Sequence, residues 1–171
     1  MPHKHTDWSE LAYRASEVLF ARKGKNVKDV VDLLVEEKVA SARGLEAKLK
    51  RGTYRFALFL ELMSVLGVDA PPEWQPLFVT NDLSYATRAR LVLIRELNKR
   101  NLDRSGFLAR LRDAHIRVPR NDSSEEAMED GTFTMVLMLQ LAALAPVEGM
   151  ERFVDMSDVL RVASQSAKGE M

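Results

Sequence analysis

The residues between 38 and 55 have the types and spacing needed to bind phosphate groups. Leu45 and Leu49 lie four residues apart and therefore share one face of a helix. Around them stand six basic side chains against one acidic side chain, Glu46; the basic ones are Lys38, Arg43, Lys48, Lys50, Arg51 and Arg55. A short helix with small and basic residues on its outer face suits base and phosphate contacts, because small side chains let the backbone approach base edges. The residues expected to point outward are Arg43, Ala47, Lys50 and Arg51, with Lys48 on the flank.

Two hydroxyl side chains extend this candidate site at the ends of the helix. Ser41 is expected to cap the basic helix, and Thr53 is expected to cap the next helix, whose first amides could hold a phosphate. The predicted DNA-binding residues are Ser41, Arg43, Ala47, Lys48, Lys50, Arg51, Thr53 and Arg55. The same charges also fit a protein partner, or a helix face that is only solvated.

Helical periodicity positions these residues, and no stretch alternates as a strand would. Helices are predicted from Asp7 through about Lys23, over 27–38, after the cap Ser41 through Arg51, and over 54–66, with a short fifth helix opened by Pro71 and Pro72. Asp7 and Glu10 predict a capping box for the first helix, and Asn26 is expected to cap the second. Gly24 and Gly67 are expected to end helices.

The pattern of the first half recurs in the second half. Arg14-Ala15 and Val18-Leu19 match Arg88-Ala89 and Val92-Leu93 at an offset of 74 residues. Residues 30–39 match 107–116 at an offset of 77, and residues 52–68 match 131–147 at 79. The offset grows only between predicted helices, as loop insertions in a duplicated unit would make it. We therefore predict an all-α protein of two tandem helix-turn-helix-like units, 7–78 and 82–153, followed by a C-terminal segment, 154–171, with a helix from about Ser157 to Ser164.

The second copy of the basic helix is acidic. The segment "DSSEEAMED", residues 122–130, contains five carboxylates and no basic residue: Asp122, Glu125, Glu126, Glu129 and Asp130. Phosphates would repel it, so DNA contact through a third helix is expected only in the first unit. The ten Arg and Lys residues between Arg88 and Arg120 could still contact a DNA backbone. An ordinary solvated helix with a capping box of Ser123 and Glu126 is the alternative for this segment.

The stretch "LEAKLKRGTYRFALFLELMSVLGV", residues 45–68, resembles the third and fourth helices of λ-repressor-like (XRE-type) helix-turn-helix domains. It is closer to a small bacterial domain family, largely uncharacterised, whose motif reads K-I-x-R-G-x-F. Lys48, Leu49, Arg51, Gly52 and Tyr54 match that motif position by position. The resemblance covers residues 8–70, and 86–147 only in hydrophobic pattern; it implies a five-helix DNA-binding-like fold, present as two tandem copies with the second degenerate.

Composition narrows the classes of partner. The 25 basic and 25 acidic residues cancel, so any polyanion must be recognised by a local patch. The chain has no cysteine, which removes disulfides and thiol catalysis and suits a cytoplasmic location. The longest apolar run, 133–145, is broken by Gln140 and is shorter than the ~20 residues of a membrane span, so no membrane partner is expected.

No motif predicts catalysis. The chain lacks a glycine-rich phosphate loop, Gly-x-Ser-x-Gly and His-Glu-x-x-His, so no enzymatic activity and no cofactor are expected. His3 and His5 are too few for a metal site. A stripe of three methionines is expected to fill the core, the alternative being an adaptable protein-binding groove: Met128, Met135 and Met138.

The pattern as a whole predicts a DNA-binding transcriptional regulator that reads double-stranded DNA through the third helix of the first unit. In that scheme the second unit forms a homodimer or holds a protein partner. The alternative is a protein–protein interaction module, dimerising or regulator-binding, on the same scaffold without DNA binding.

Overall fold

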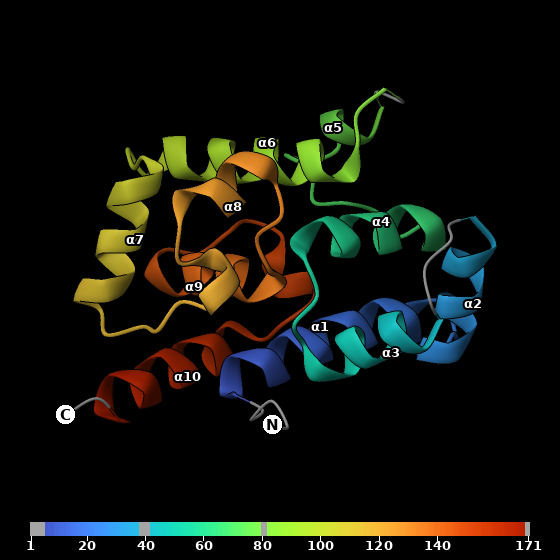
Figure 1. The fold of residues 1–171 in the computed structure, drawn as a ribbon, viewed down its shortest axis with the longest axis horizontal. Coiled ribbons are helices and arrows are strands. Elements are labelled where there is room, and N and C mark those ends of the chain that lie inside the picture. The colour runs from blue at the N-terminus through green and yellow to red at the C-terminus, as the bar shows by residue number, and fades with distance from the viewer. Residues whose placement is uncertain (1–5, 38–41, 80–81, 170–171) are drawn as a thin grey trace.

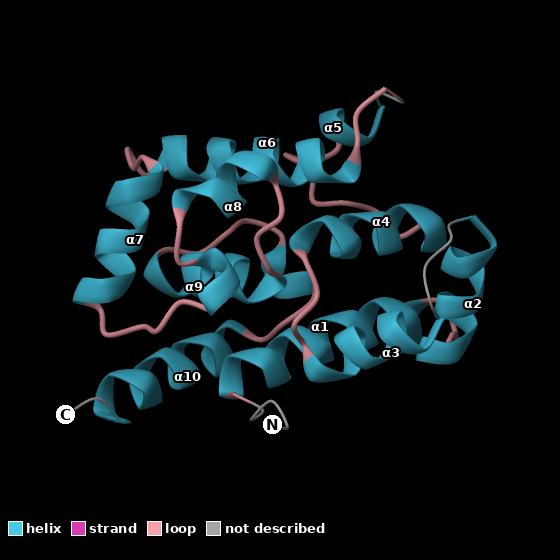
Figure 2. Cartoon of the chain, in the orientation of Figure 1, coloured by secondary structure: helices cyan, strands magenta, loops and turns pink. Residues whose placement is uncertain are grey.

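The computed structural model describes residues 6–37, 42–79 and 82–169, and helices dominate all three ranges (Figures 1 and 2). The all-α prediction is therefore confirmed. In chain order the helices are α1 (Asp7–Arg22), α2 (Val27–Glu37), α3 (Ala42–Arg51), α4 (Phe56–Leu66), α5 (Pro76–Val79), α6 (Tyr85–Lys99), α7 (Arg104–Asp113), α8 (Glu125–Asp130), α9 (Met135–Leu144) and α10 (Met156–Gly169). Two short 3₁₀ turns, η1 (Arg120–Asp122) and η2 (Met150–Arg152), precede α8 and α10. None of the helices in these ranges has the length and apolar character that crossing a bilayer requires.

The first two helices are capped by side chains, although not both as predicted. The Thr6 hydroxyl accepts a hydrogen bond from the Ser9 amide at 3.1 Å, and the Ser9 hydroxyl oxygen accepts one from the Thr6 amide at 3.0 Å. The predicted box of Asp7 and Glu10 is therefore wrong by one residue, because Thr6 is an equally good cap and stands directly before Asp7. Asn26 caps α2 as predicted, accepting from the Asp29 amide at 2.9 Å.

The start of α4 differs from the prediction. The helix begins at Phe56 rather than Tyr54, and its capping residue is Arg55, whose side chain makes no capping hydrogen bond. Thr53 is therefore not a helix cap. The reason lies in the second half, since the Phe56 amide donates to the Phe133 carbonyl at 3.0 Å and holds the preceding residues extended. The end of α4 is as predicted, with Gly67 in the left-handed conformation.

An approximate two-fold relation joins the two halves at this point. Arg55 and Thr134 form an antiparallel bridge, flanked by hydrogen bonds from Phe56 to Phe133 and from the Met135 amide to the Tyr54 carbonyl, each 3.0 Å. Figure 1 shows the relation around its centre: α1 runs below and α6 above, α2 lies at the right and α7 at the left, and α4 lies beside α9. Each half therefore supplies one arm of the same bridge.

The halves also share one core. In this reciprocal arrangement α4 packs on α6, while α9 packs on α1. The Phe56 ring stacks on Phe133 at 5.7 Å between centroids, and Phe59 meets Phe153 edge-on at 5.2 Å. Trp74, in the segment that follows α4, is fully buried and meets Phe56 at 5.6 Å. The methionine stripe, which comprises Met128, Met135 and Met138, is almost completely buried, so its prediction as core is confirmed.

In the structure, α6 corresponds to α1 at an offset of 77 residues, not at the predicted offset of 74. Gly24 and Asn101, which follow α1 and α6, both have positive φ, 62° and 55°. Arg14 is exposed while Arg88 is buried, so the pairing of these two arginines is wrong. The error arises because the apolar positions of a helix recur every three or four residues, so two helices also align well when shifted by one turn. At 77, every residue buried in α6 has a buried counterpart in α1; the pairs are Leu11/Arg88, Ala12/Ala89, Ala15/Val92, Ser16/Leu93, Leu19/Glu96 and Phe20/Leu97.

The segments that follow α4 and α9 also correspond. The Trp74 amide bonds to the Pro71 carbonyl at 2.9 Å, and 79 residues later Phe153 bonds to Met150 at 3.0 Å. The short helix predicted to open at Pro71 and Pro72 begins only at Pro76, because turns occupy the residues between. Its counterpart α10 is longer than predicted and packs on α9 and α1.

Candidate nucleic-acid interface

The basic helix α3 is seated by its apolar side and presents its charges outward. Leu49 is 1% exposed and Leu45 is partly buried, while α3 as a whole packs on α1 and α2. Ala47 is partly buried, and Ser41 lies outside the described residues. Five basic side chains are exposed, as the sequence analysis predicted: Arg43, Lys48, Lys50, Arg51 and Arg55.

Gly52 fixes the position of the end of α3. Its φ is 68°, and a Cβ built there would lie 1.8 Å from the carbonyl oxygen of Ser9 in α1. The chain then turns, with the Thr53 amide donating to the Lys48 carbonyl at 3.2 Å. The glycine therefore serves two purposes, since it allows the left-handed turn that ends α3 and the close backbone contact with α1. Both place Arg51 and Thr53 beside the first residues of α1.

The phosphate site expected at the start of α4 is not formed as predicted. Thr53 is exposed, but it stands three residues before the helix, and the first helical amide, that of Phe56, is bonded to Phe133. An anion therefore cannot use that amide, because the bridge between the halves has already taken it. The exposed Thr53 hydroxyl remains a predicted contact.

Two further arginines lie across a groove from Arg51. Arg117 and Arg120, in the segment before α8, are exposed and line a groove of about 780 Å³ together with Arg51 and Thr53. The sequence places both arginines only within a broad basic stretch, because their approach to α3 depends on how the two halves pack. The groove thus extends the basic surface from α3 to the second half.

Glu46 moderates the charge of α3. Its carboxylate lies 2.9 Å from the Lys50 ammonium, one helical turn away, and both side chains are partly exposed. The hydrogen bond and charge of Glu46 raise the pKa of Lys50, so the ammonium stays protonated at neutral pH. Because the pair is exposed, its attraction is screened by water and Lys50 can exchange Glu46 for a phosphate.

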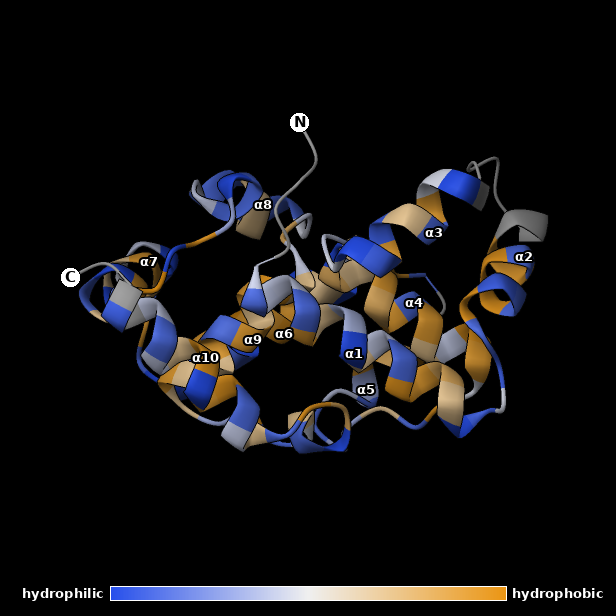
Figure 3. Cartoon of the chain, turned by 90° about the horizontal axis from the view of Figure 1, so that it is seen from below, coloured by the Kyte–Doolittle hydropathy of each residue, from blue (hydrophilic) through white to orange (hydrophobic). Residues whose placement is uncertain are grey.

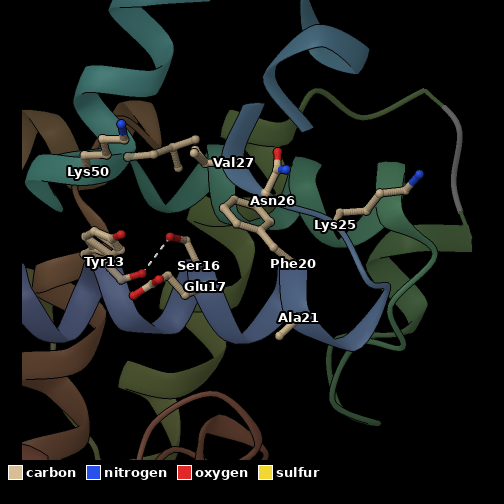
Figure 4. A pocket seen from close by; sticks show the side chains of 10 residues that line it. Tyr13, Ser16, Glu17, Phe20, Ala21, Lys25, Asn26, Val27 and Lys50 are labelled. Carbon is tan, nitrogen blue, oxygen red and sulfur yellow. Dashed lines mark hydrogen bonds between the residues drawn. The ribbon is translucent and has the colours of Figure 1, made fainter. Parts of the chain in front are cut away.

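A smaller hollow of about 300 Å³ lies behind α3, between α1 and the start of α2 (Figure 4). Glu17, Tyr13 and Lys50 are among the side chains that line it. Burial, followed by the charge of Glu17, raises the pKa of Tyr13, which therefore remains a neutral phenol. Lys25 also lines the hollow, but the hollow lies behind α3 and not on its outer face, so it is not part of the candidate interface.

The acidic helix α8 faces the same side of the molecule as α3 (Figure 3). Its Glu129 carboxylate lies 2.9 Å from the Arg104 guanidinium, and Glu125 lies 3.9 Å from it. The capping box predicted there is wrong, since the capping residue is Ser124 without a side-chain bond and the Ser123 hydroxyl donates to the Arg120 carbonyl at 2.7 Å. Arg104 of the same chain therefore balances part of the negative charge of α8.

A comparison of the chain with protein-family models, curated proteins and solved structures found no match. The resemblance to helix-turn-helix domains therefore depends on the motif around Gly52. Within the described ranges, no three His, Asp or Glu side chains are grouped as metal ligands would be, and His3 and His5 lie outside those ranges.

Proposed function

We propose that the protein is a DNA-binding transcriptional regulator that contacts duplex DNA through the outer face of α3. The observation that carries the proposal is the exposure of the cationic residues of α3 around its buried Leu49. A short helix braced by a preceding helix can enter a major groove, and Arg and Lys at its surface bind phosphates and guanine edges. Arg117 and Arg120 extend the phosphate-binding surface beyond α3.

The proposed footprint covers a single half-site. Helix α8 lies on the same side of the protein, but it has carboxylates where α3 has cations. DNA seated on α3 is repelled where it approaches α8, so the two halves do not read two symmetric half-sites. We expect α8 to set one boundary of the contacted duplex.

Salt-dependent binding to a short duplex tests the proposal. A fluorescently labelled duplex of random sequence should bind at about 50 mM salt and weaken steeply by about 200 mM; with about five phosphate contacts, log K should fall with a slope of roughly −4 to −5 against log salt. Lys50→Glu with Arg51→Glu should abolish this binding. The matched control, Glu125→Lys with Glu126→Lys in α8, should retain or strengthen it. Absence of binding at the lower salt, or wild-type affinity in the α3 variant, would contradict DNA recognition by α3.

The charge reversal between α3 and α8 favours one alternative, a protein-interaction module. An exposed basic helix and an exposed acidic helix on one chain can pair between copies, and such a heterologous contact propagates. Sedimentation of the protein at low salt distinguishes the two. Growth of oligomers that the Glu125→Lys and Glu126→Lys changes abolish, without DNA binding by the wild type, would favour the interaction module.

A further inference from the structure

The groove between the two halves has the size of a small-molecule site. Its volume is about 780 Å³, and it lies among the first residues of α1, the end of α3, the segment 117–121 and helix α9. Sites for small organic ligands typically measure roughly 300–1,000 Å³ and occur where two structural units meet. The groove therefore has room for a ligand of two or three fused or linked rings.

The groove combines an apolar wall with a cationic rim. Side chains that contribute apolar surface are Trp8, Val118, Pro119 and Val136. Among the described residues of its lining, the charged ones are Arg51, Arg117 and Arg120 against one carboxylate, Asp7. A guanidinium attracts carboxylate, sulfonate or phosphate groups and can bind two of their oxygens at once. This lining fits an anion with an apolar body better than it fits a cation or a sugar.

Two polar atoms in the lining residues have no hydrogen-bond partner within the described part of the chain. One is the indole Nε1 of Trp8, a residue that is 5% exposed. The other is Oε1 of Gln140, which is fully buried. The amide of Gln140 is held in place, since its Nε2 donates to the Arg117 carbonyl at 2.9 Å. Buried polar atoms are rarely left without a partner, because the lost hydration is not regained.

The neighbouring polar side chains show that this is not a general feature of the groove. Asn121 Nδ2 donates to the Asp122 carboxylate and to the Thr132 carbonyl, each at 3.0 Å, and the Thr134 hydroxyl donates to Asp122 at 2.5 Å. The donor on Trp8 and the acceptor on Gln140 are therefore exceptions among the buried polar atoms near the groove. Both atoms are enclosed by protein, so what the groove itself offers a ligand is its apolar wall and its cationic rim.

We propose that this groove binds a small aromatic anion, with the rings against Trp8 and Val136 and the anionic group among the arginines of the rim. Arg51 and Thr53 belong both to the groove and to the α3 face. A bound anion neutralises Arg51 and occupies the space that a DNA phosphate would approach, so it competes with DNA. This second step depends on the proposed DNA-binding function, whereas the binding of the anion does not.

The dye 8-anilinonaphthalene-1-sulfonate is a suitable probe, because it has aromatic rings and one anionic group. We expect saturable binding at a single site, detected by dye fluorescence and by energy transfer from tryptophan. The variant Arg117→Glu with Arg120→Glu should weaken binding by about tenfold or more, because it reverses two rim charges. The uncharged analogue N-phenyl-1-naphthylamine should bind the wild type about tenfold less tightly for the same reason.

Two further variants separate the groove from other apolar surface. Val136→Phe, which fills the groove from α9, should abolish dye binding, whereas Leu160→Ala removes an exposed apolar side chain of α10 and should leave it unchanged. Circular dichroism of each variant establishes that it is folded; should Val136→Phe fail to fold, the arginine variant alone decides. Absence of saturable binding, or equal binding by the wild type and the arginine variant, would overturn the proposal.

The competition step is measured with the labelled duplex. If the dye displaces DNA from the wild type but not from the Val136→Phe variant, whose basic residues are unchanged, both steps hold. Dye binding without any DNA binding would leave the ligand site in place and remove the DNA function. If both ligands bind the wild type together without competing, the groove site stands and the competition step is wrong.

Discussion

Helices α3 and α8 are equivalent helices of the two halves, related by the approximate two-fold, yet their outer surfaces have opposite charge. Their buried anchors correspond, since Leu49 and Met128 are each 1% exposed. At the positions that follow, Lys50 and Arg51 in α3 are replaced by acidic residues, Glu129 and Asp130, in α8. The fold therefore constrains the inner side of this helix and leaves its outer side open to different partners.

Comparing the ends of α3 and α8 also explains which residue of the motif around Gly52 serves packing. Gly52 and Gly131 have φ values of 68° and 73°, and a Cβ at either would lie within 2 Å of a carbonyl oxygen, that of Ser9 at 1.8 Å or that of Ala86 at 1.9 Å. Each glycine thus lets the end of the third helix touch the first helix of its own half. Part of the likeness to helix-turn-helix sequences therefore reflects a packing requirement that is independent of DNA.

The largest expected effect comes from filling these two close contacts. Gly52→Ala and Gly131→Ala should each lower the free energy of unfolding by about 3–5 kcal/mol, through left-handed strain and a clash with backbone. Gly67→Ala is the control, because Gly67 has φ 67° but open space around its Cβ position, and it should cost only about 1–2 kcal/mol. Urea unfolding followed by circular dichroism measures all three. Equal losses at the three glycines would show that the close approach to the first helices is unimportant.

The next largest effect on stability concerns the ends of α4 and α9, the fourth helices of the two halves. Helix α4 ends in a glycine, whereas α9 ends at an extended Ala145 followed by Pro146. One guanidinium nitrogen of Arg100 donates to the carbonyls of Ala145 and Pro146, at 2.8 and 2.7 Å. Its other terminal nitrogen donates to the buried carboxylate of Glu96 at 3.0 Å. Arg100 therefore holds the chain where it leaves α9, whereas the left-handed Gly67 turns the chain where it leaves α4.

Arg100→Met should lower the free energy of unfolding by about 2–4 kcal/mol, because it leaves the Glu96 carboxylate and two carbonyls without this partner. Adding Glu96→Leu, the residue found at the equivalent position 19, should recover part of that loss. Urea unfolding again gives the values. A loss below about 0.5 kcal/mol in the single variant would contradict this role of Arg100.

A pH-dependent difference is expected at Asp122, which has no acidic counterpart in the first half. Its buried carboxylate accepts from the Thr134 amide at 2.9 Å and from the Thr134 hydroxyl. Burial raises the pKa of Asp122 above its ordinary value of 3.8, with the Thr134 and Asn121 hydrogen bonds opposing the shift. The folded state thus favours the protonated acid. The stability that this carboxyl contributes is therefore present below pH 3.8 and is lost as pH rises through the higher pKa of the folded protein.

The variant Asp122→Asn removes this titration. Relative to the wild type, it should become progressively more stable as pH rises from about 4 to about 7. Urea midpoints of the two proteins at several pH values measure the difference, so that the titrations they share cancel. A difference that stays constant over this range, or that changes in the opposite direction, would contradict the raised pKa.

The smallest effect on stability is expected from exchanging the outer charges. Giving α3 the charges of α8, by Lys50→Glu with Arg51→Asp, changes only exposed side chains and an exposed ion pair with Glu46. The urea midpoint should stay close to that of the wild type. A large drop in the midpoint would show that these cations support the fold, and a loss of DNA binding in this variant would then not identify a contact surface.

Local features of the chain were predictable where a single element decides them. The caps at Asn26 and Gly67, the apolar anchor of α3 and the exposure of its basic residues follow from residue type and helical spacing. The late start of α4 was not predictable, because the hydrogen bond that delays it comes from Phe133, 77 residues away along the chain. The groove was missed for the same reason, since its arginines belong to different halves.

The reciprocal packing of α4 on α6 and of α9 on α1 has a consequence for how the chain is made. While the ribosome has released only the first half, the sides of α1 and α4 that later become interior face water, including the ring of Phe56. The nascent segment can complete its core only when α6 and α9 have emerged. A truncated product ending near residue 79 is therefore expected to leave the apolar sides of α1 and α4 uncovered, as a substrate for chaperones and proteases.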